Sequence, residues 1–260
     1  MTERAEDDLG LTGLADQTFS FVFLVSHMRS YSSLLGHLLA QTRSIDGYSE
    51  LHRAYTTEDD LERMASDVRA TLDGPLMGDR LFDKLLHRAC TIDPAIVARD
   101  DVRIILSVRT PAATLASLVA LGSRDDSVRW AADPERALLH YQRRLEDIRE
   151  LAKCAPDAAL LVADDLFRSP RSILDEIGVF LGLDEPVPEH YRLQPLTGHK
   201  RSGDSSAKIR SGVIRNDPVE ADGEVPPAVV AAGVDAFNAA LAGEELRALT
   251  PLGGPHEYLS

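Results

Sequence analysis

Short apolar runs alternate with amphipathic segments along this chain. Three runs rich in aliphatic and β-branched residues predict buried strands of a parallel sheet: Phe19–Val25, Val102–Val108 and Ala158–Ala163. Apolar residues at helical spacing predict helices over 34–41, 57–72, from 111 onward, 133–153, 169–182 and 226–248. Because strands and helices alternate, we expect an α/β fold with a mainly parallel central sheet flanked by helices.

The length and charge of the chain limit its organisation and its partners. Its 260 residues suit one domain over 18–260, after an acidic flexible arm at 1–17. A net charge of −14 argues against nucleic-acid binding, which needs positive charge facing phosphates. No apolar run is long enough for a bilayer, so no membrane partner is expected. Two cysteines, Cys90 and Cys154, favour a reducing cytoplasm over a disulfide framework.

A polar loop follows the first predicted strand and leads directly into a helix. It contains Arg29, Ser30, Tyr31, Ser32 and Ser33. The backbone N–H groups and the dipole at the start of a helix favour an anion, and serine hydroxyls and a guanidinium add further donors. The alternative is a capped helix beside a surface arginine. The glycine-rich signature of P-loop kinases is absent from this loop.

Two later segments also carry anion-binding chemistry. Arg109 ends the second predicted strand, and Ser117 lies about two turns into the next helix, so both could donate to one phosphate. The alternative is a surface arginine and a serine packed against the sheet. Further along, Lys200–Gly212 combines glycines with cations in a long loop. That composition suits wrapping a polyanion, and its alternative is a solvated linker.

In this order and spacing, the three segments resemble the motifs of sulfotransferases that use 3′-phosphoadenosine-5′-phosphosulfate (PAPS). RSYSSLL resembles the phosphosulfate-binding loop, RTPAATLAS the 3′-phosphate motif, and GDSSAKIRSG the late loop that closes over the nucleotide. ADDLFRSPRSILDEIGVFLGLDEP is similar to a further segment of that family. The resemblance covers about residues 20–215 and lies closest to a bacterial branch. It implies a P-loop-like sulfotransferase fold and a PAPS cosubstrate, with no metal.

The resemblance also implies roles for individual residues. Side chains of the first loop would hold the 5′-phosphosulfate, and Arg109 with Ser117 the 3′-phosphate. Arg201 and Gly203 would belong to the closing loop. Tyr31 departs from the pattern, because it stands where the family usually has glycine. If that position needs a positive φ, a tyrosine there is strained.

Transfer of a sulfuryl group needs cations at the transferring group and a base for the acceptor hydroxyl. Arg29 is the first candidate cation, and Lys84 the second, since it resembles a family lysine at the end of a central strand; the alternative for Lys84 is a solvated helix lysine. Glu50 is the preferred base, provided that burial raises its pKa, and His52 is the runner-up. His87 and His27 rank below them.

The sequence therefore predicts a cytoplasmic sulfotransferase acting on a hydroxyl of a small molecule such as a natural product, a lipid or another metabolite. Neither the acceptor nor the oligomeric state is readable from the residues. Two alternatives stay open. One is a kinase-like nucleotide-binding protein that requires Mg²⁺. The other is a non-catalytic protein that binds the nucleotide without turning over an acceptor.

Overall fold

A computed structural model describes residues 18–199, 208–215, 224–242 and 247–249. Within these ranges, a six-stranded sheet has the order β2-β3-β1-β4-β5-β6, and each pair of neighbours is parallel. The strands are β1 (Ser20–Ser26), β2 (Ile45–Asp46), β3 (Arg80–Leu85), β4 (Val102–Val108), β5 (Ala159–Val162) and β6 (Arg247–Leu249). The predicted α/β class and parallel sheet are confirmed. The expected arm at 1–17 lies outside the described residues.

Helices connect the strands, as the alternation predicted. They are α1 (Ser32–Leu39), α2 (Glu58–Arg69), α3 (Pro94–Val97), α4 (Pro111–Arg124), α5 (Pro134–Cys154), α6 (Asp165–Arg168), α7 (Pro170–Leu181) and α8 (Pro227–Leu241), with 3₁₀ turns η1 (Asp126–Ala132) and η2 (Lys208–Ser211). Proline at the first turn suits α4, α5, α7 and α8, because the N–H group that proline lacks has no partner at a helix start. None of the described helices is long and apolar enough to span a membrane.

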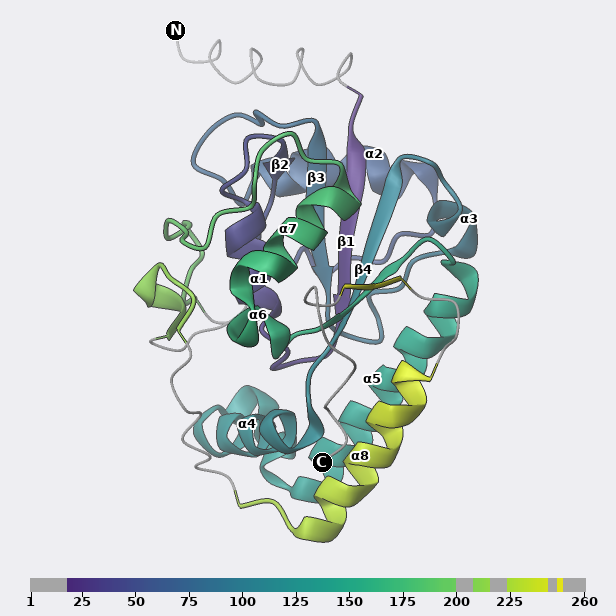
Figure 1. The fold of residues 1–260 in the computed structure, drawn as a ribbon, viewed down its shortest axis with the longest axis vertical. Coiled ribbons are helices and arrows are strands. Elements are labelled where there is room, and N and C mark those ends of the chain that lie inside the picture. Colours follow the sequence, from purple (N-terminus) through teal and green to yellow (C-terminus); the bar gives the residue numbers. More distant parts are fainter. Residues whose placement is uncertain (1–17, 200–207, 216–223, 243–246, 250–260) are drawn as a thin grey trace, which may run out of the picture.

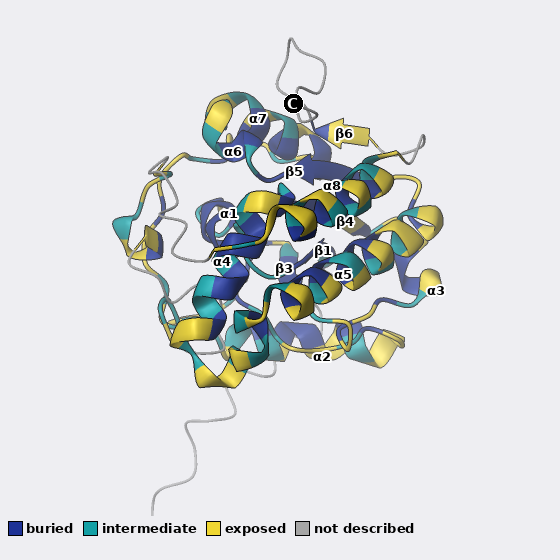
Figure 2. Cartoon of the chain, turned by 90° about the horizontal axis from the view of Figure 1, so that it is seen from below, coloured by how far each residue is buried: buried dark blue, intermediate teal, exposed yellow. Residues whose placement is uncertain are grey.

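The sheet separates two apolar cores. Along β1, Phe21, Phe23 and Val25 pack into one core, whereas Val22 and Leu24 pack into the other. Such alternation follows from the two-residue period of a strand, and burying each of these side chains contributes about 1.5–3 kcal/mol. In Figure 1, α1, α6 and α7 cover one face of the sheet, and α2, α3 and α5 lie on the other. Figure 2 shows the central strands as buried and the outer helix faces as exposed.

The end of one helix and three strands, β2, β3 and β6, differ from the sequence prediction. The predicted helix 226–248 is too long, because α8 ends at Leu241 and Arg247–Leu249 forms β6 at the sheet edge. The pattern also missed β3, which carries Asp83 and Lys84 among its apolar residues. Both charged side chains are buried, so an apolar-run criterion cannot detect this strand.

The carboxyl ends of the central strands lie together at one end of the sheet, beside α4 (Figure 1). On α5, the buried Arg144 links two of these ends: its Nε donates to the carbonyl of Ser26 (2.8 Å), and its Nη2 donates to the carbonyl of Leu85 (2.5 Å). This guanidinium fixes β1 and β3 relative to each other where polar loops leave the sheet.

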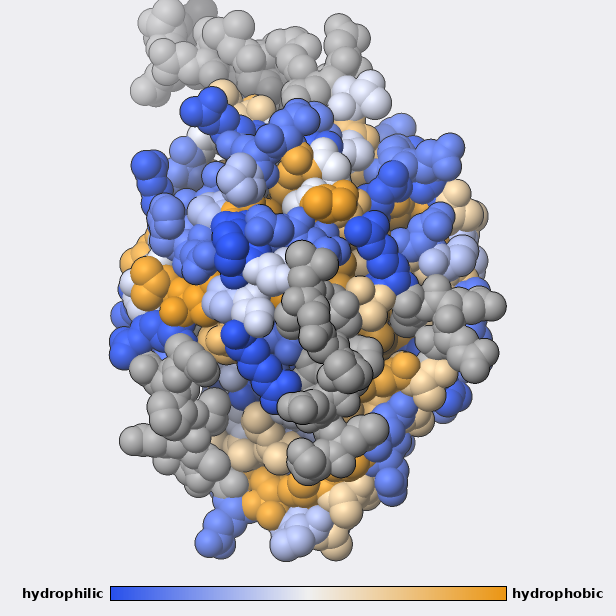
Figure 3. All heavy atoms as spheres, viewed as in Figure 1, coloured by the Kyte–Doolittle hydropathy of each residue, from blue (hydrophilic) through white to orange (hydrophobic). Residues whose placement is uncertain are grey.

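Figure 3 shows hydrophilic residues over much of the visible face and an apolar region at its lower end, near α8.

Candidate active site at the carboxyl ends of the strands

The loop after β1 has a left-handed backbone at two non-glycine residues. Arg29 has φ 65° and Tyr31 has φ 62°, and α1 begins immediately afterwards at Ser32. The position of Tyr31 therefore adopts the positive φ that the missing family glycine would allow. A left-handed backbone at a non-glycine residue costs about 1–2 kcal/mol of conformational free energy. Contacts with surrounding residues must therefore stabilise the loop in this conformation. One such contact joins the hydroxyls of Ser30 and Ser26, which are 2.6 Å apart and buried.

Arg109, at the end of β4, is buried against this loop, so the surface alternative for this residue is wrong. Its Nη1 donates to the carbonyl of Arg29 (2.9 Å), and its Nη2 donates to the hydroxyl of Tyr31 (2.5 Å). Its Nε is buried and has no hydrogen-bond partner among the described residues; the nearest carboxylate oxygen, from Asp164, is 3.7 Å away. Burial lowers the pKa of Arg109, opposed by Tyr31 and Asp164. A cation with an unpaired buried donor is suited to an anionic ligand.

Ser117 lies on α4 and joins the two predicted anion motifs. The Nε of Arg29 donates to its hydroxyl at 2.8 Å. The sequence paired Ser117 with Arg109, whereas in this structure the hydroxyl of Ser117 accepts a hydrogen bond from Arg29. Because Arg109 in turn holds the carbonyl of Arg29, all three residues belong to one network between the loops that follow β1 and β4.

Lys84 connects the β1 loop to a neighbouring acidic side chain. It lies within β3 and is buried, so the alternative of a solvated helix lysine is wrong. Its Nζ donates to the hydroxyl of Ser33 (3.2 Å) and lies 3.8 Å from Oε1 of Glu50. The single ammonium therefore reaches both the predicted anion loop and the predicted base.

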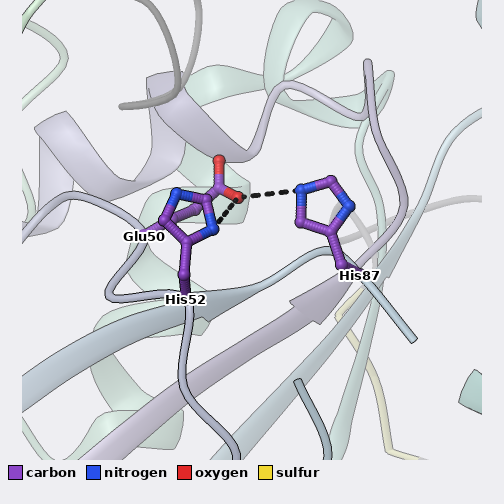
Figure 4. Close-up of side chains that lie close together, drawn as sticks. All are labelled: Glu50, His52 and His87. Carbon is purple, nitrogen blue, oxygen red and sulfur yellow. Dashed lines mark ion pairs between the residues drawn. The ribbon is translucent and has the colours of Figure 1, made fainter. Parts of the chain in front are cut away.

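Glu50, His52 and His87 form one cluster, shown in Figure 4. Oε2 of Glu50 lies 3.5 Å from Nε2 of His87 and 3.8 Å from Nδ1 of His52. The carboxylate side chain is only 7% exposed, whereas the imidazoles are 46% (His52) and 41% (His87) exposed, so ligands can reach them from solvent. His52 also has a left-handed backbone, with φ 54°. The cluster thus faces solvent with its two imidazoles and keeps its carboxylate inside.

The sequence analysis preferred Glu50 as the base on the condition that burial raises its pKa, and the structure does not meet this condition. Burial raises the pKa of Glu50, but the hydrogen bond from His87 and the charges of Lys84, His87 and His52 outweigh it, so the pKa lies below its ordinary value. The carboxylate is therefore ionised at neutral pH. An ionised carboxylate next to an imidazole orients the ring and stabilises its protonated form.

Asp83 is a supporting residue that the sequence analysis missed. One of its oxygens accepts the N–H of Leu51 (2.9 Å) and that of Lys84 (2.7 Å), and the other accepts the hydroxyl of Tyr55 (2.8 Å). These bonds anchor the segment that carries Glu50 and His52 to β3. Burial raises the pKa of Asp83 to about 7 in spite of the three donors. Only the buried position of a charged residue inside a strand could have signalled this role.

His27 lies apart from the acid–imidazole cluster. The backbone N–H of Arg109 donates to its Nε2 (3.0 Å), so its Nδ1 carries the proton and donates to the carbonyl of Met28 (2.8 Å). Burial lowers the pKa of His27 to about 3. This ring is a neutral structural link between β1 and β4.

The sequence analysis assigned Arg201 and Gly203 to the closing loop. Both lie outside the described residues.

Comparisons with known proteins identify the fold. No family model and no curated protein matches the sequence. Solved structures do match: the sulfotransferase domain of the Synechococcus PCC 7002 olefin synthase is 20% identical with a TM-score of 0.57, covering 92% of this chain and 98% of that one. Mouse sulfotransferase SULT7A1, solved with PAP, is 13% identical with a TM-score of 0.54, covering 92% and 91%. The chain therefore has the sulfotransferase fold.

Proposed function

We propose that this chain transfers a sulfuryl group from PAPS to a hydroxyl group of a small molecule. The observation that carries this proposal is the position of Lys84, whose ammonium contacts both Ser33 of the β1 loop and Glu50 of the acid–imidazole cluster. One cation thereby joins an anion-binding loop to a proton-accepting group. In-line transfer between a phosphosulfate and a hydroxyl needs these two features side by side.

The donor would lie over the loops that follow β1 and β4. Arg29, Ser30, Tyr31, Ser32 and Ser33 would hold the 5′-phosphosulfate, with the backbone of the first turn of α1 as a further source of donors. Arg109 would hold the 3′-phosphate, and its unpaired buried Nε supports that role. The fold neighbour SULT7A1 was solved with PAP, which is the product that PAPS leaves after transfer.

The acceptor hydroxyl would lie between the cluster and the donor. Its oxygen forms a bond to sulfur while the bond from sulfur to the 5′-phosphate oxygen breaks, leaving PAP. Lys84 would neutralise charge that develops on the transferring group. The hydroxyl proton must leave at the same time, and the side chains that could take it belong to Glu50, His52 and His87.

The ionised state of Glu50 directs the base assignment to an imidazole. A carboxylate with a lowered pKa is a weak base at neutral pH, whereas a neutral imidazole has the appropriate basicity. His87 lies nearer to Oε2 of Glu50 than His52 does, at 3.5 Å against 3.8 Å. In this proposal His87 takes the proton, and Glu50 orients the ring and stabilises the imidazolium.

The proposal is tested by incubating the protein with PAPS and a panel of small-molecule alcohols and phenols, with a metal chelator present. Mass spectrometry should detect one added SO₃ group on at least one acceptor, together with PAP. Phosphoryl transfer from ATP that depends on Mg²⁺ would favour the kinase-like alternative. Binding of PAP with no turnover of any acceptor would favour a non-catalytic nucleotide-binding protein.

A further inference from the structure

The acid–imidazole cluster has the composition of a metal site. Among the described residues, Glu50, His52 and His87 form a group in which one ligand atom from each side chain lies within 4.8 Å of the others. Two imidazole nitrogens and one carboxylate oxygen are ligands suited to Zn²⁺ and similar borderline cations. With bonds of about 2.0–2.1 Å, tetrahedral ligands lie about 3.3 Å apart. The two observed distances from Oε2, 3.5 and 3.8 Å, require only small movements.

The two oxygens of Glu50 are already divided between different partners. Oε2 faces both imidazoles, and Oε1 faces the ammonium of Lys84 at 3.8 Å. A metal ion at Oε2 would therefore leave the contact with Lys84 in place. Asp83 holds the chain next to Glu50 through the N–H of Leu51. Such outer contacts orient the ligands of metal sites and strengthen binding.

The backbone and the exposure of the cluster also suit an ion arriving from solvent. His52 holds a left-handed φ of 54°, a conformation that is costly for histidine and that accompanies the approach of its ring to Glu50. The imidazoles are partly exposed, so an ion can reach them without unfolding of the chain. Three protein ligands leave a fourth position for water.

From this geometry we infer that Glu50, His52 and His87 bind one Zn²⁺-class ion, and that the ion inhibits the enzyme. The inhibition rests on the proposed function, whereas the binding does not. An imidazole bound to the metal through the nitrogen that faces Glu50 carries its proton on the other nitrogen. It then has no lone pair left to accept the acceptor's proton. The ion would leave the donor loops free, so PAP should bind equally well with or without it.

Binding is tested directly, without any activity measurement. The intact protein is titrated with Zn²⁺ by calorimetry and with Co²⁺ by visible absorption, which distinguishes four-coordinate from hydrated cobalt. We expect one ion per chain. His52→Asn, which tolerates the left-handed backbone, and His87→Ala should each weaken binding about tenfold or more. His190→Ala, which removes an exposed histidine outside the cluster, should bind as the wild type does. Unchanged affinity in both cluster variants would overturn the site.

The inhibitory role has its own test. Zn²⁺ should stop sulfuryl transfer, EDTA should restore it, and the affinity for PAP should stay unchanged. A transfer rate that is unaffected or raised by saturating Zn²⁺ would refute the inhibition. If no acceptor is ever sulfated, the proposed function fails while the calorimetric result still decides the metal site.

Discussion

The guanidinium of Arg109 lies over the ring of Tyr31, with Cζ 4.0 Å from the ring centroid, and donates to its hydroxyl at 2.5 Å. A glycine at position 31 would offer Arg109 neither a ring nor a hydroxyl to contact. The tyrosine has a left-handed backbone, and the contact with the buried cation offsets part of its cost. Its ring also packs against that of Phe167 in an edge-to-face arrangement, with ring centroids 4.5 Å apart. The residue that departs from the family pattern is thus built into the proposed phosphate site.

Removing only the hydroxyl of this tyrosine tests that contact. In Tyr31→Phe the ring stays, but Nη2 of Arg109 loses the acceptor that orients it. We expect PAP to bind about fivefold more weakly, corresponding to one lost hydrogen bond of about 1 kcal/mol. Calorimetry with PAP and with adenosine 5′-phosphate measures the difference. Tighter binding of PAP in the variant would show that the hydroxyl competes with the 3′-phosphate.

Arg109→Ala should remove recognition of the 3′-phosphate. Loss of a buried charged donor should weaken PAP binding by about 2–4 kcal/mol. A nucleotide that lacks the 3′-phosphate should bind nearly as it does to the wild type. The comparison of the two nucleotides within the same variant controls for any general loss of stability. An equal loss for both nucleotides in calorimetry would remove Arg109 from the 3′-phosphate site.

Glu50→Gln separates chemistry from donor binding. The amide keeps the size of the side chain but cannot stabilise an imidazolium, so the transfer rate should fall about a hundredfold or more. The affinity for PAP should remain close to that of the wild type. Glu62→Gln, at an exposed position of α2, is the matched control and should leave the rate unchanged. A Glu50→Gln variant with full activity would exclude Glu50 from catalysis.

Single substitutions of the two histidines then locate the base. His87→Ala should reproduce the rate loss of Glu50→Gln, and His52→Asn should retain more activity, because His87 lies nearer to the carboxylate. Single-turnover kinetics with saturating donor would compare the variants at the chemical step. The reverse order of rates would assign the base to His52.

The stability of the protein should fall in acid partly because of His27. Its folded-state pKa is about 3 and its ordinary value is 6.5, so between these values the unfolded chain binds a proton that the folded chain excludes. Stability from this group is therefore present above pH 6.5 and is lost as the pH falls toward 3, by up to about 1.4 kcal/mol per pH unit.

His27→Gln should flatten this dependence in denaturant unfolding measured between pH 6.5 and 4. His190→Gln, at an exposed site, should keep the wild-type slope.

Asp83 affects the stability in the opposite direction. With its folded pKa raised from 3.8 to about 7, its contribution is present below pH 3.8 and is lost as the pH rises toward 7. Because the two groups oppose each other, the test compares variants by the slope of the free energy of unfolding against pH. Equal slopes for the wild type and His27→Gln would refute the role of His27.

The sequence predicted those parts of the fold in which local pattern and tertiary environment agree. The apolar runs gave β1, β4 and β5, and proline with acidic first turns marked several helices. It missed β3 because Asp83 and Lys84 break the apolar run. Their burial depends on partners such as Tyr55 and Ser33, which are distant in sequence. Likewise, the end of the predicted helix 226–248 could not be separated from β6, whose three residues pair with β5.

The sequence predicted which residues belong to the candidate site better than it predicted the contacts between them. Motif spacing singled out Arg29, Arg109 and Ser117, but the contact between Arg29 and Ser117 depends on how the loop after β1 meets helix α4 in space. His87 ranked low because nothing local ties it to Glu50, 37 positions earlier in the chain. The lowered pKa of Glu50 results from this same approach of distant charges. Helix and strand periodicity carries no information on such contacts.

The most direct test of the account follows the sulfuryl group itself. PAPS carrying radioactive sulfur is incubated with the wild type, Glu50→Gln and Glu62→Gln in the presence of a panel of hydroxyl acceptors, and both products are quantified in each reaction. The account predicts equal amounts of PAP and labelled acceptor from the wild type and Glu62→Gln, and at least about a hundredfold less of both from Glu50→Gln. The absence of labelled acceptor from every reaction would contradict it, whether or not the protein binds PAP.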